Sequence, residues 1–208
     1  MKKILCYGDS NTWGCSPRDS SRYDEKTRWP MVMGLILGAD YTVIEEGLNG
    51  RTVLNFSPVE TMANGIEYIS SLIVNYVPVD IVIISLGLND VFIAEDVTPG
   101  EISDGVEQII DIIRENHASA GCSTPWIIIM SPSGFNTGIE GFTFFELKIN
   151  KLKCLPESYR NLCSEKNCSF FNASDYVTGS EIDGSHLEQG SHKLLGEKIA
   201  EFILSGPE

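Results

Sequence analysis

Short apolar runs alternate with longer amphipathic segments along the chain, and this alternation restricts the possible folds more than any other feature. The clearest run, VDIVIISLG at residues 79–87, is apolar and β-branched almost throughout. Such a run is typical of a strand covered on both faces, as strands of parallel sheets are. Further strands are predicted on the same grounds at residues 3–7, 41–46, 126–130 and, from a weaker pattern, 168–174.

Amphipathic segments separate these strands. Between residues 101 and 116, apolar side chains recur at helical spacing, at Ile102, Val106, Ile109, Ile110 and Ile113. Further helices are expected at residues 29–37, at 66–76, from Pro156 onward and at 188–204. Strands that alternate with helices form βαβ units, so we expect an α/β fold, a parallel sheet with helices on both faces. The length suits a single domain over residues 1–208.

The charge of the chain limits its expected partners. Its 15 Lys and Arg face 29 Asp and Glu, which gives a formal net charge of -14. An acidic surface repels phosphate groups, so nucleic acids and anionic membranes are not expected partners. No run reaches the roughly 18 apolar residues of a membrane-spanning helix, and the N-terminus lacks the pattern of a signal peptide. We therefore expect a cytoplasmic protein, or one whose export signal has been removed, that acts on a small molecule.

Glycine and polar residues directly follow four of the predicted strands. These four segments cover residues 8–12, 47–52, 85–90 and 131–134. A fifth polar segment, residues 183–186, lies just before the last predicted helix. Parallel strands end at one edge of their sheet, and ligands of such folds bind there. The five segments are therefore expected to converge at this edge.

The residue types at this edge suit acyl transfer. A serine hydroxyl needs an imidazole to take its proton, and the imidazole needs a carboxylate to fix its tautomer. Ser10 is the candidate nucleophile, and Asp183 lies three residues before His186, so one turn could bring its carboxylate to the ring. The backbone amides of Ser10 and Gly50 and the side chain of Asn89 are candidate donors to an oxyanion.

Four blocks in this order, GDSNTWG, GLNGRT, GLND and DGSH, resemble those of the SGNH (GDSL) hydrolase superfamily. The four letters of the superfamily name fall on Ser10, Gly50, Asn89 and His186. The flanking sequence is similar to that of a small aryl-esterase and acyltransferase branch of this superfamily, through an RW pair at residues 28–29 and the segment VIEEGLNGRT. The resemblance covers nearly the whole chain and is weakest at residues 134–168.

The resemblance implies a three-layer α/β/α sandwich with a five-stranded parallel sheet, flavodoxin-like in outline. It also implies hydrolysis of short-chain carboxylic esters without a metal or another cofactor. Ser10 would be the nucleophile, His186 the general base and then acid, and Asp183 the residue that orients the histidine. The amides of Ser10 and Gly50 and the Asn89 side chain would form the oxyanion hole.

Two positions depart from related patterns. Asn11 stands where the namesake motif of the family has leucine. Thr12 stands where the GxSxG elbow of the α/β-hydrolases has its second glycine, which argues against the larger lipase fold.

Candidates for the substrate pocket lie beside the motif residues, at Asp9, Trp13 and Asn49. Trp29, like Trp13, suits a pocket wall and ordinary packing equally. The long connection at residues 134–155 suits a pocket wall or a subunit contact, because it carries Phe135, Phe142, Phe144 and Phe145. The resembling branch uses this region in oligomer assembly, which implies a homo-oligomer whose site admits small acyl groups.

Several of these residues have plainer interpretations. Ser10 alone suits a helix cap, and Asn89 suits a turn beside Asp90. His117 is expected at a solvated helix end, and His192 at the surface or in a hydrogen bond between helices. A metal site would use a set that matches no strong spacing rule, namely Asp183, His186, Glu188 and His192.

Three functions fit the sequence. The leading one is a serine hydrolase of acetyl or aryl esters that acts through an acyl-enzyme on Ser10. The same residues suit an acyltransferase or a thioesterase, and a catalytically silent binding module could keep the same fold. The intact set of Ser10, Asp183, His186 and Asn89 argues against a silent module.

Overall fold

A computed structural model, which describes residues 1–56, 64–140 and 142–207, contains one five-stranded sheet. Its strands are β1 (Lys2–Gly8), β2 (Tyr41–Gly47), β3 (Ile81–Ser85), β4 (Trp126–Ser131) and β5 (Ser169–Asn172). All are parallel and lie in the order β2-β1-β3-β4-β5. The five predicted strands and the parallel sheet are confirmed.

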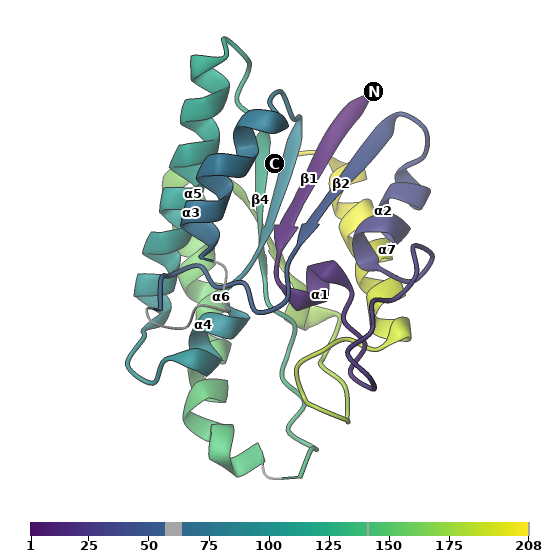
Figure 1. Cartoon of the computed structure of the whole chain (residues 1–208), viewed down its shortest axis with the longest axis vertical. Coiled ribbons are helices and arrows are strands. Elements are labelled where there is room, and N and C mark those ends of the chain that lie inside the picture. Colours follow the sequence, from purple (N-terminus) through teal and green to yellow (C-terminus); the bar gives the residue numbers. More distant parts are fainter. Residues whose placement is uncertain (57–63, 141, 208) are drawn as a thin grey trace.

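Helices cover both faces of the sheet (Figure 1). One face carries α2 (Trp29–Leu37) and α7 (Gln189–Ser205), and the other carries α3 (Gly65–Leu72), α5 (Pro99–Ser119) and α6 (Glu146–Lys166). Two short helices, α1 (Ser10–Trp13) and α4 (Leu88–Ile93), follow β1 and β3 closely. Short 3-10 turns occur at Ile73–Asn75, Phe142–Phe145 and Ala173–Asp175. The fold is the three-layer α/β/α sandwich that the sequence predicts.

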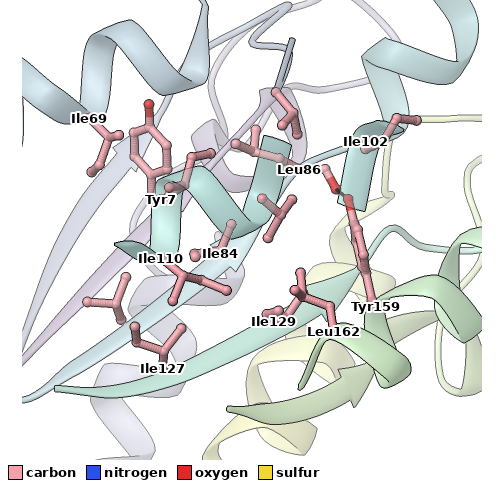
Figure 2. Close-up of a cluster of buried hydrophobic side chains, with 14 of the residues drawn as sticks. Tyr7, Ile69, Ile84, Leu86, Ile102, Ile110, Ile127, Ile129, Tyr159 and Leu162 are labelled. Atoms are coloured by element: carbon pink, nitrogen blue, oxygen red, sulfur yellow. Dashed lines mark hydrogen bonds between the residues drawn. The ribbon is translucent and has the colours of Figure 1, made fainter. Parts of the chain in front are cut away.

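Alternating side chains of the strands supply two cores, one on each face of the sheet. Leu5 and Tyr7 of β1 pack with α3, α5 and α6, whereas Ile4 and Cys6 pack with α2 and α7. Figure 2 shows the first core, in which isoleucines of β3, β4 and α5 interlock. Trp29 is fully buried in the second core and is a packing residue. Each fully buried aliphatic side chain contributes roughly 1.5–3 kcal/mol to stability.

The carboxyl ends of the central strands lie level with one another. Gly8 at the end of β1 pairs with Gly47 of β2 on one side and with Ser85 of β3 on the other. β1 therefore ends at the switch point of the sheet, where open α/β sheets bind ligands. A Cβ atom on Gly47 would lie 2.1 Å from the backbone nitrogen of Trp13, so glycine there lets α1 lie close to the strand ends. The segment before α7 reaches the same edge (Figure 1).

The start of α6 differs from the prediction. The helix begins at Glu146 and continues through Pro156 to Lys166, so the expectation that Pro156 starts it is wrong. A proline inside a helix costs about 3 kcal/mol, because it removes a hydrogen bond and crowds the preceding turn. Burial of Leu155 and Tyr159 on either side of the proline offsets this cost. No helix of the described residues is both long enough and apolar enough to span a membrane.

Candidate active site

Ser10 is the first residue of α1, directly after the end of β1. The N-cap residue is Asp9, whose side chain accepts a hydrogen bond of 2.9 Å from the backbone amide of Asn11. The interpretation of Ser10 as a helix cap is therefore wrong, and its hydroxyl is available to another partner. The helix ends at Gly14, whose φ of 89° favours glycine. Ser10 is thus held at the start of a short, well-capped helix.

The segment before α7 folds around the carboxylate of Asp183. Its Oδ1 atom accepts hydrogen bonds from the backbone amides of Ser185 and His186 and from the hydroxyl of Ser180, each at 3.0 Å. Aspartate commonly forms turns of this kind with the amides that follow it. These bonds fix the carboxylate and leave its Oδ2 atom to face the imidazole.

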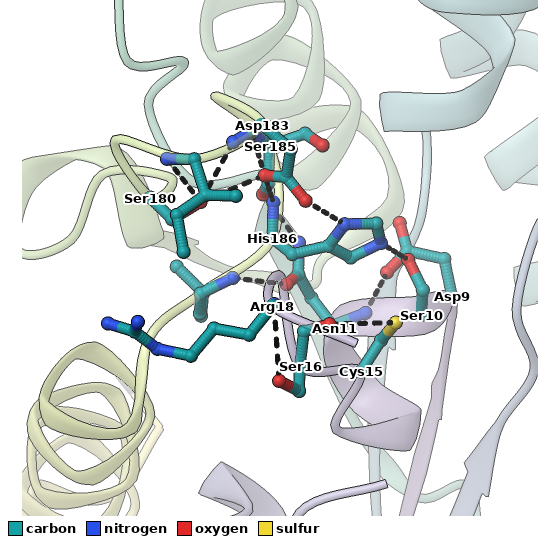
Figure 3. A network of polar contacts seen from close by, with 12 residues as sticks. Asp9, Ser10, Asn11, Cys15, Ser16, Arg18, Ser180, Asp183, Ser185 and His186 are labelled. Carbon is teal, nitrogen blue, oxygen red and sulfur yellow. Dashed lines mark hydrogen bonds and ion pairs between the residues drawn. The ribbon is translucent and has the colours of Figure 1, made fainter. Parts of the chain in front are cut away.

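A continuous hydrogen-bonded chain joins Asp183, His186 and Ser10 (Figure 3). Oδ2 of Asp183 lies 2.7 Å from Nδ1 of His186, and Nε2 of His186 lies 2.9 Å from Oγ of Ser10. When Nδ1 carries the ring proton and donates it in a hydrogen bond to the carboxylate, the neutral imidazole offers Nε2 as an acceptor to the Ser10 hydroxyl. This arrangement can take the proton from the hydroxyl as its oxygen attacks a carbonyl carbon.

The pKa values of the pair agree with this chemistry. Burial alone would raise the pKa of Asp183, but hydrogen bonds from His186 and Ser185 lower it to about 2. The hydrogen bond to Asp183 raises the pKa of His186 above its ordinary value, against the opposite effect of burial. The carboxylate is therefore ionised at neutral pH and stabilises the protonated imidazole.

Gly50 lies in the turn that follows β2. The amide of Arg51 donates to the carbonyl of Leu48 at 3.1 Å, and Gly50 has a φ of 74°. The third position of such a turn favours glycine, so turn geometry alone accounts for the residue type. The amide of Leu48 also donates to the carbonyl of Gly8 at 3.1 Å. The turn is therefore attached to the end of β1, two residues before Ser10.

α4 holds the segment that follows this turn. The side-chain amide of Asn89 donates to the carbonyl of Arg51 at 2.9 Å. The carboxylate of Asp90 accepts bonds of 2.9 to 3.0 Å from the amides of Val53 and Leu54. Asp90 is fully buried, and this burial raises its pKa to about 6. Asn89 has a second N–H for another acceptor. The structure thus links Asn89 to the segment that carries Gly50.

A buried arginine, to which the sequence assigned no role, joins the strand ends. Arg51 is 1% exposed, and its Nη1 atom donates to the carbonyls of Gly8, at 2.9 Å, and of Glu46. Its guanidinium also lies 4.4 Å from the ring of Tyr7 and 4.7 Å from that of Tyr68. These contacts offset part of the cost of burying the cation. Its place in the block GLNGRT is the only signal that the sequence offers.

The three pocket candidates have different surroundings. Asp9 is 4% exposed, and burial raises its pKa to about 6. Asn49 is exposed in the turn after β2. Trp13 is half-buried, and its ring lies 5.5 Å from the guanidinium of Arg22. Asp9 adjoins Ser10 as the helix cap, but in the part of the chain that the structure describes no hydrogen bond joins the other two to Ser10.

Aromatic rings lie beside the turn that carries His186. The centroid of Phe135 lies 5.3 Å from that of Phe92 in α4, and the centroid of Phe145 lies 5.7 Å from that of Phe92. A Cβ atom on Gly184 would lie 2.5 Å from the ring of Phe135, so this ring contacts the turn itself. The side chains of the other two phenylalanines lie outside the described residues, namely Phe142 and Phe144.

The other two histidines are buried, contrary to prediction. Nδ1 of His117 lies 2.8 Å from the carbonyl of Ile113, and its Nε2 lies 3.2 Å from the amide of Val79. His192 packs edge-on against Tyr23, and among the described residues neither of its ring nitrogens has a hydrogen-bond partner. Burial lowers its pKa to about 3. Within the described ranges, no group of three His, Cys, Asp or Glu side chains is placed to hold a metal ion.

Comparison with known proteins identifies the family of the chain. The family model of the GDSL-like lipase/acylhydrolase family matches residues 6–192. An aryl esterase from M. smegmatis is 32% identical, with a TM-score of 0.89 and 99% of both chains covered. A carbohydrate acetylesterase from Sinorhizobium meliloti is 31% identical, with a TM-score of 0.88 and 99% of both chains covered. A search among curated proteins gives no match. The chain therefore has the SGNH hydrolase fold and belongs to the GDSL-like lipase/acylhydrolase family.

Proposed function

We propose that this protein hydrolyses short-chain carboxylic esters through an acyl-enzyme formed on Ser10. The observation that carries the proposal is the chain from Asp183 through His186 to Ser10, with distances of 2.7 and 2.9 Å. Family membership supports it, as does the similarity to an aryl esterase and a carbohydrate acetylesterase.

In the first half-reaction, Oγ of Ser10 forms a bond to the ester carbonyl carbon while Nε2 of His186 accepts the hydroxyl proton. The carbonyl oxygen becomes an oxyanion, which accepts hydrogen bonds from the amides of Ser10 and Gly50 and from the Asn89 side chain. Among the described residues neither backbone amide donates to another group, which supports this role. His186 then gives its proton to the departing alkoxide oxygen, the C–O bond breaks, and the alcohol leaves.

Water completes the cycle. His186 takes a proton from a water molecule as the water oxygen attacks the acyl carbon, and it returns this proton to Oγ of Ser10 when the carboxylic acid leaves. Asp183 keeps its charge throughout, because it holds the imidazole in one tautomer and stabilises its cation. A pKa of about 2 suits this constant charge.

The aromatic rings beside the turn of His186 support the choice of substrate. Phe135 contacts the turn of His186 and stacks on Phe92, with Phe145 beside them. Aromatic rings favour an apolar acyl or aryl group over a charged one. We therefore propose acetyl or aryl esters as the substrate class.

Two serine substitutions test the proposed nucleophile. Turnover of p-nitrophenyl acetate is expected to fall by roughly 10⁴-fold or more in Ser10→Ala. Ser103→Ala is the matched control, because Ser103 is also buried but its hydroxyl donates to the carbonyl of Ser158 in α6 and not to a histidine. We expect it to keep wild-type turnover. Comparable turnover in Ser10→Ala and the wild type would refute the proposed nucleophile.

A series of p-nitrophenyl esters from acetyl to octanoyl tests the substrate class. We expect kcat/KM to be highest for the shortest acyl groups and to fall with chain length, whereas a steady rise toward octanoyl would contradict a short-chain site. Product analysis with an added alcohol separates hydrolysis from acyl transfer by the same residues.

Self-association through residues 134–155 is a further part of the proposal. Sedimentation velocity is expected to give a multiple of the 22.9 kDa chain mass. A single-chain mass at every concentration would contradict it.

A further inference from the structure

Asn11 directly follows the proposed nucleophile and is 8% exposed. Its Oδ1 atom accepts a hydrogen bond of 3.0 Å from the backbone amide of Leu187, and its Nδ2 atom donates one of 3.1 Å to the carbonyl of Ser185. These two residues stand immediately before and after His186, and the amide of Asn11 faces this segment in Figure 3. Both ends of one side-chain amide therefore bind the backbone on either side of His186.

The pattern is that of a parallel β-ladder, in which one residue binds the residues before and after its partner. Here a side chain takes the place of a strand, across a separation of 174 and 176 residues. A planar amide suits this purpose because it offers a donor and an acceptor on opposite sides. Leucine, which stands at this position in the namesake motif, can form neither bond.

The backbone of His186 itself is hydrogen-bonded within its own segment. Its amide donates to Asp183 at 3.0 Å, and its carbonyl accepts from the amide of Ser180 at 2.8 Å. These bonds hold His186 against Asp183 but do not attach it to α1. The bonds from Asn11 do attach it, and Asn11 and Ser10 are neighbours in a helix of four residues.

We propose that Asn11 is a positioning residue, whose amide clamps the backbone on both sides of His186 and so keeps Nε2 within reach of Ser10. This inference rests on the proposed function and deepens it. A misplacement of about 1 Å between reacting groups can cost about 10²-fold in rate. Loss of the clamp would lengthen the distance from Ser10 to His186 and leave the bond from His186 to Asp183 intact.

The first test replaces Asn11 by leucine, which is of similar size but forms neither bond. With p-nitrophenyl acetate, kcat per active site is expected to fall about 10- to 100-fold, with KM within about threefold of the wild type. Active sites are counted from the end point of titration with diethyl p-nitrophenyl phosphate. The matched control is Asn116→Leu, because among the described residues the Asn116 side chain bonds only the carbonyl of Ile112, near the C-terminal end of α5. This variant is expected to keep wild-type kcat.

The pH profile adds a readout that a loss of stability alone would not change. Asn11→Asp keeps the acceptor for the Leu187 amide and places a negative charge beside His186, which favours the imidazolium. The kcat of Asn11→Asp is expected to lie between those of the wild type and Asn11→Leu. The acid limb of its kcat/KM profile is expected to move to higher pH. Asn11→Leu is expected to lower the plateau and leave the acid limb in place.

Several results would overturn the clamp. One is wild-type kcat in Asn11→Leu, and another is a loss that disappears when rates are divided by titrated active sites. If Asn11→Leu does not fold, Asn11→Asp decides, and a kcat equal to the wild type with an unmoved acid limb would overturn the inference. These results differ from a failure of the proposed function, which would appear as retained activity in Ser10→Ala.

Discussion

Ser10 and His186 are 176 residues apart in the sequence, yet Oγ of the first lies 2.9 Å from Nε2 of the second. The sheet and one helix pair account for this proximity. α1 carries Ser10 at the end of β1, and the turn with His186 leads into α7, which packs against α2 on the same face. A Cβ atom on Gly196 would lie 2.7 Å from Val32, so glycine lets the two helices approach closely. The position of the imidazole therefore depends on how α7 docks.

Asp183→Asn is expected to keep the fold and to lower kcat by roughly 10³- to 10⁴-fold. An amide at this position cannot both bind the amides of the turn and hold the imidazole in the tautomer that leaves Nε2 free. Ser180→Ala is the matched control, since it removes hydrogen bonds of the same turn, including one to Oδ1 of Asp183, but leaves the carboxylate in place. Steady-state turnover of p-nitrophenyl acetate checks both variants. Equal losses in the two would show that the effect is not specific to the carboxylate.

The rate is expected to rise with pH as His186 loses its proton. The bond to Asp183 raises the pKa of this imidazole above the ordinary histidine value of about 6.5, so half-maximal kcat/KM is expected above that pH. Below it the imidazolium cannot accept the hydroxyl proton. The charge of Asp9 also raises the pKa of His186, so Asp9→Asn is expected to move the pH of half-maximal kcat/KM to a lower value. A wild-type midpoint well below 6.5 would contradict this account.

Asn89→Ala is expected to lower kcat by roughly 10²- to 10³-fold with little change in KM, as loss of an oxyanion donor does. Asn89 also bonds the carbonyl of Arg51, so the thermal unfolding midpoint must be measured alongside. A large rise in KM with unchanged kcat would instead place Asn89 in ground-state binding.

His192→Leu is expected to stabilise the fold, most of all in acid. Both ring nitrogens of His192 are buried without partners in the described structure, and burial lowers its pKa from 6.5 to about 3. Between these values the unfolded chain binds a proton that the folded chain does not, so the free energy of unfolding falls as pH falls. At about pH 5 the histidine lowers the free energy of unfolding by about 2 kcal/mol. Leucine has no proton to bind, so its substitution removes this loss.

Thermal unfolding at about pH 7 and about pH 5 checks this prediction. The midpoint of His192→Leu should exceed that of the wild type by more at the lower pH. The same offset at both pH values would mean that the imidazole does not carry the effect.

Local signals in the sequence were sufficient for the sheet and for the edge that carries the site. The apolar run that contains Ile81–Ser85 predicts a strand covered on both faces, and polar residues follow directly where it ends. Parallel strands end at one edge, so the convergence of Ser10, Gly50 and Asn89 follows from order alone.

Contacts between distant residues left no such signal. The sequence pattern predicts that Pro156 starts a helix, but Pro156 lies inside α6. The helix residues before and after the proline both pack into the core against the sheet. The sequence suggests a polar helix residue at His192, yet its ring is fully buried and packs against Tyr23, which lies far away in the sequence. Asn11 reads as a departure from a motif, and only the fold shows that its amide meets the backbone beside His186.

Labelling with diethyl p-nitrophenyl phosphate, followed by digestion and mass spectrometry, shows whether Ser10 is the nucleophile that His186 activates. The expected result is one diethylphosphoryl group per chain, attached to Ser10, with esterase activity lost in proportion to labelling and no labelling of Ser10 when His186 is replaced by alanine. Stoichiometric labelling of another serine, or loss of activity while Ser10 stays unmodified, would contradict the account.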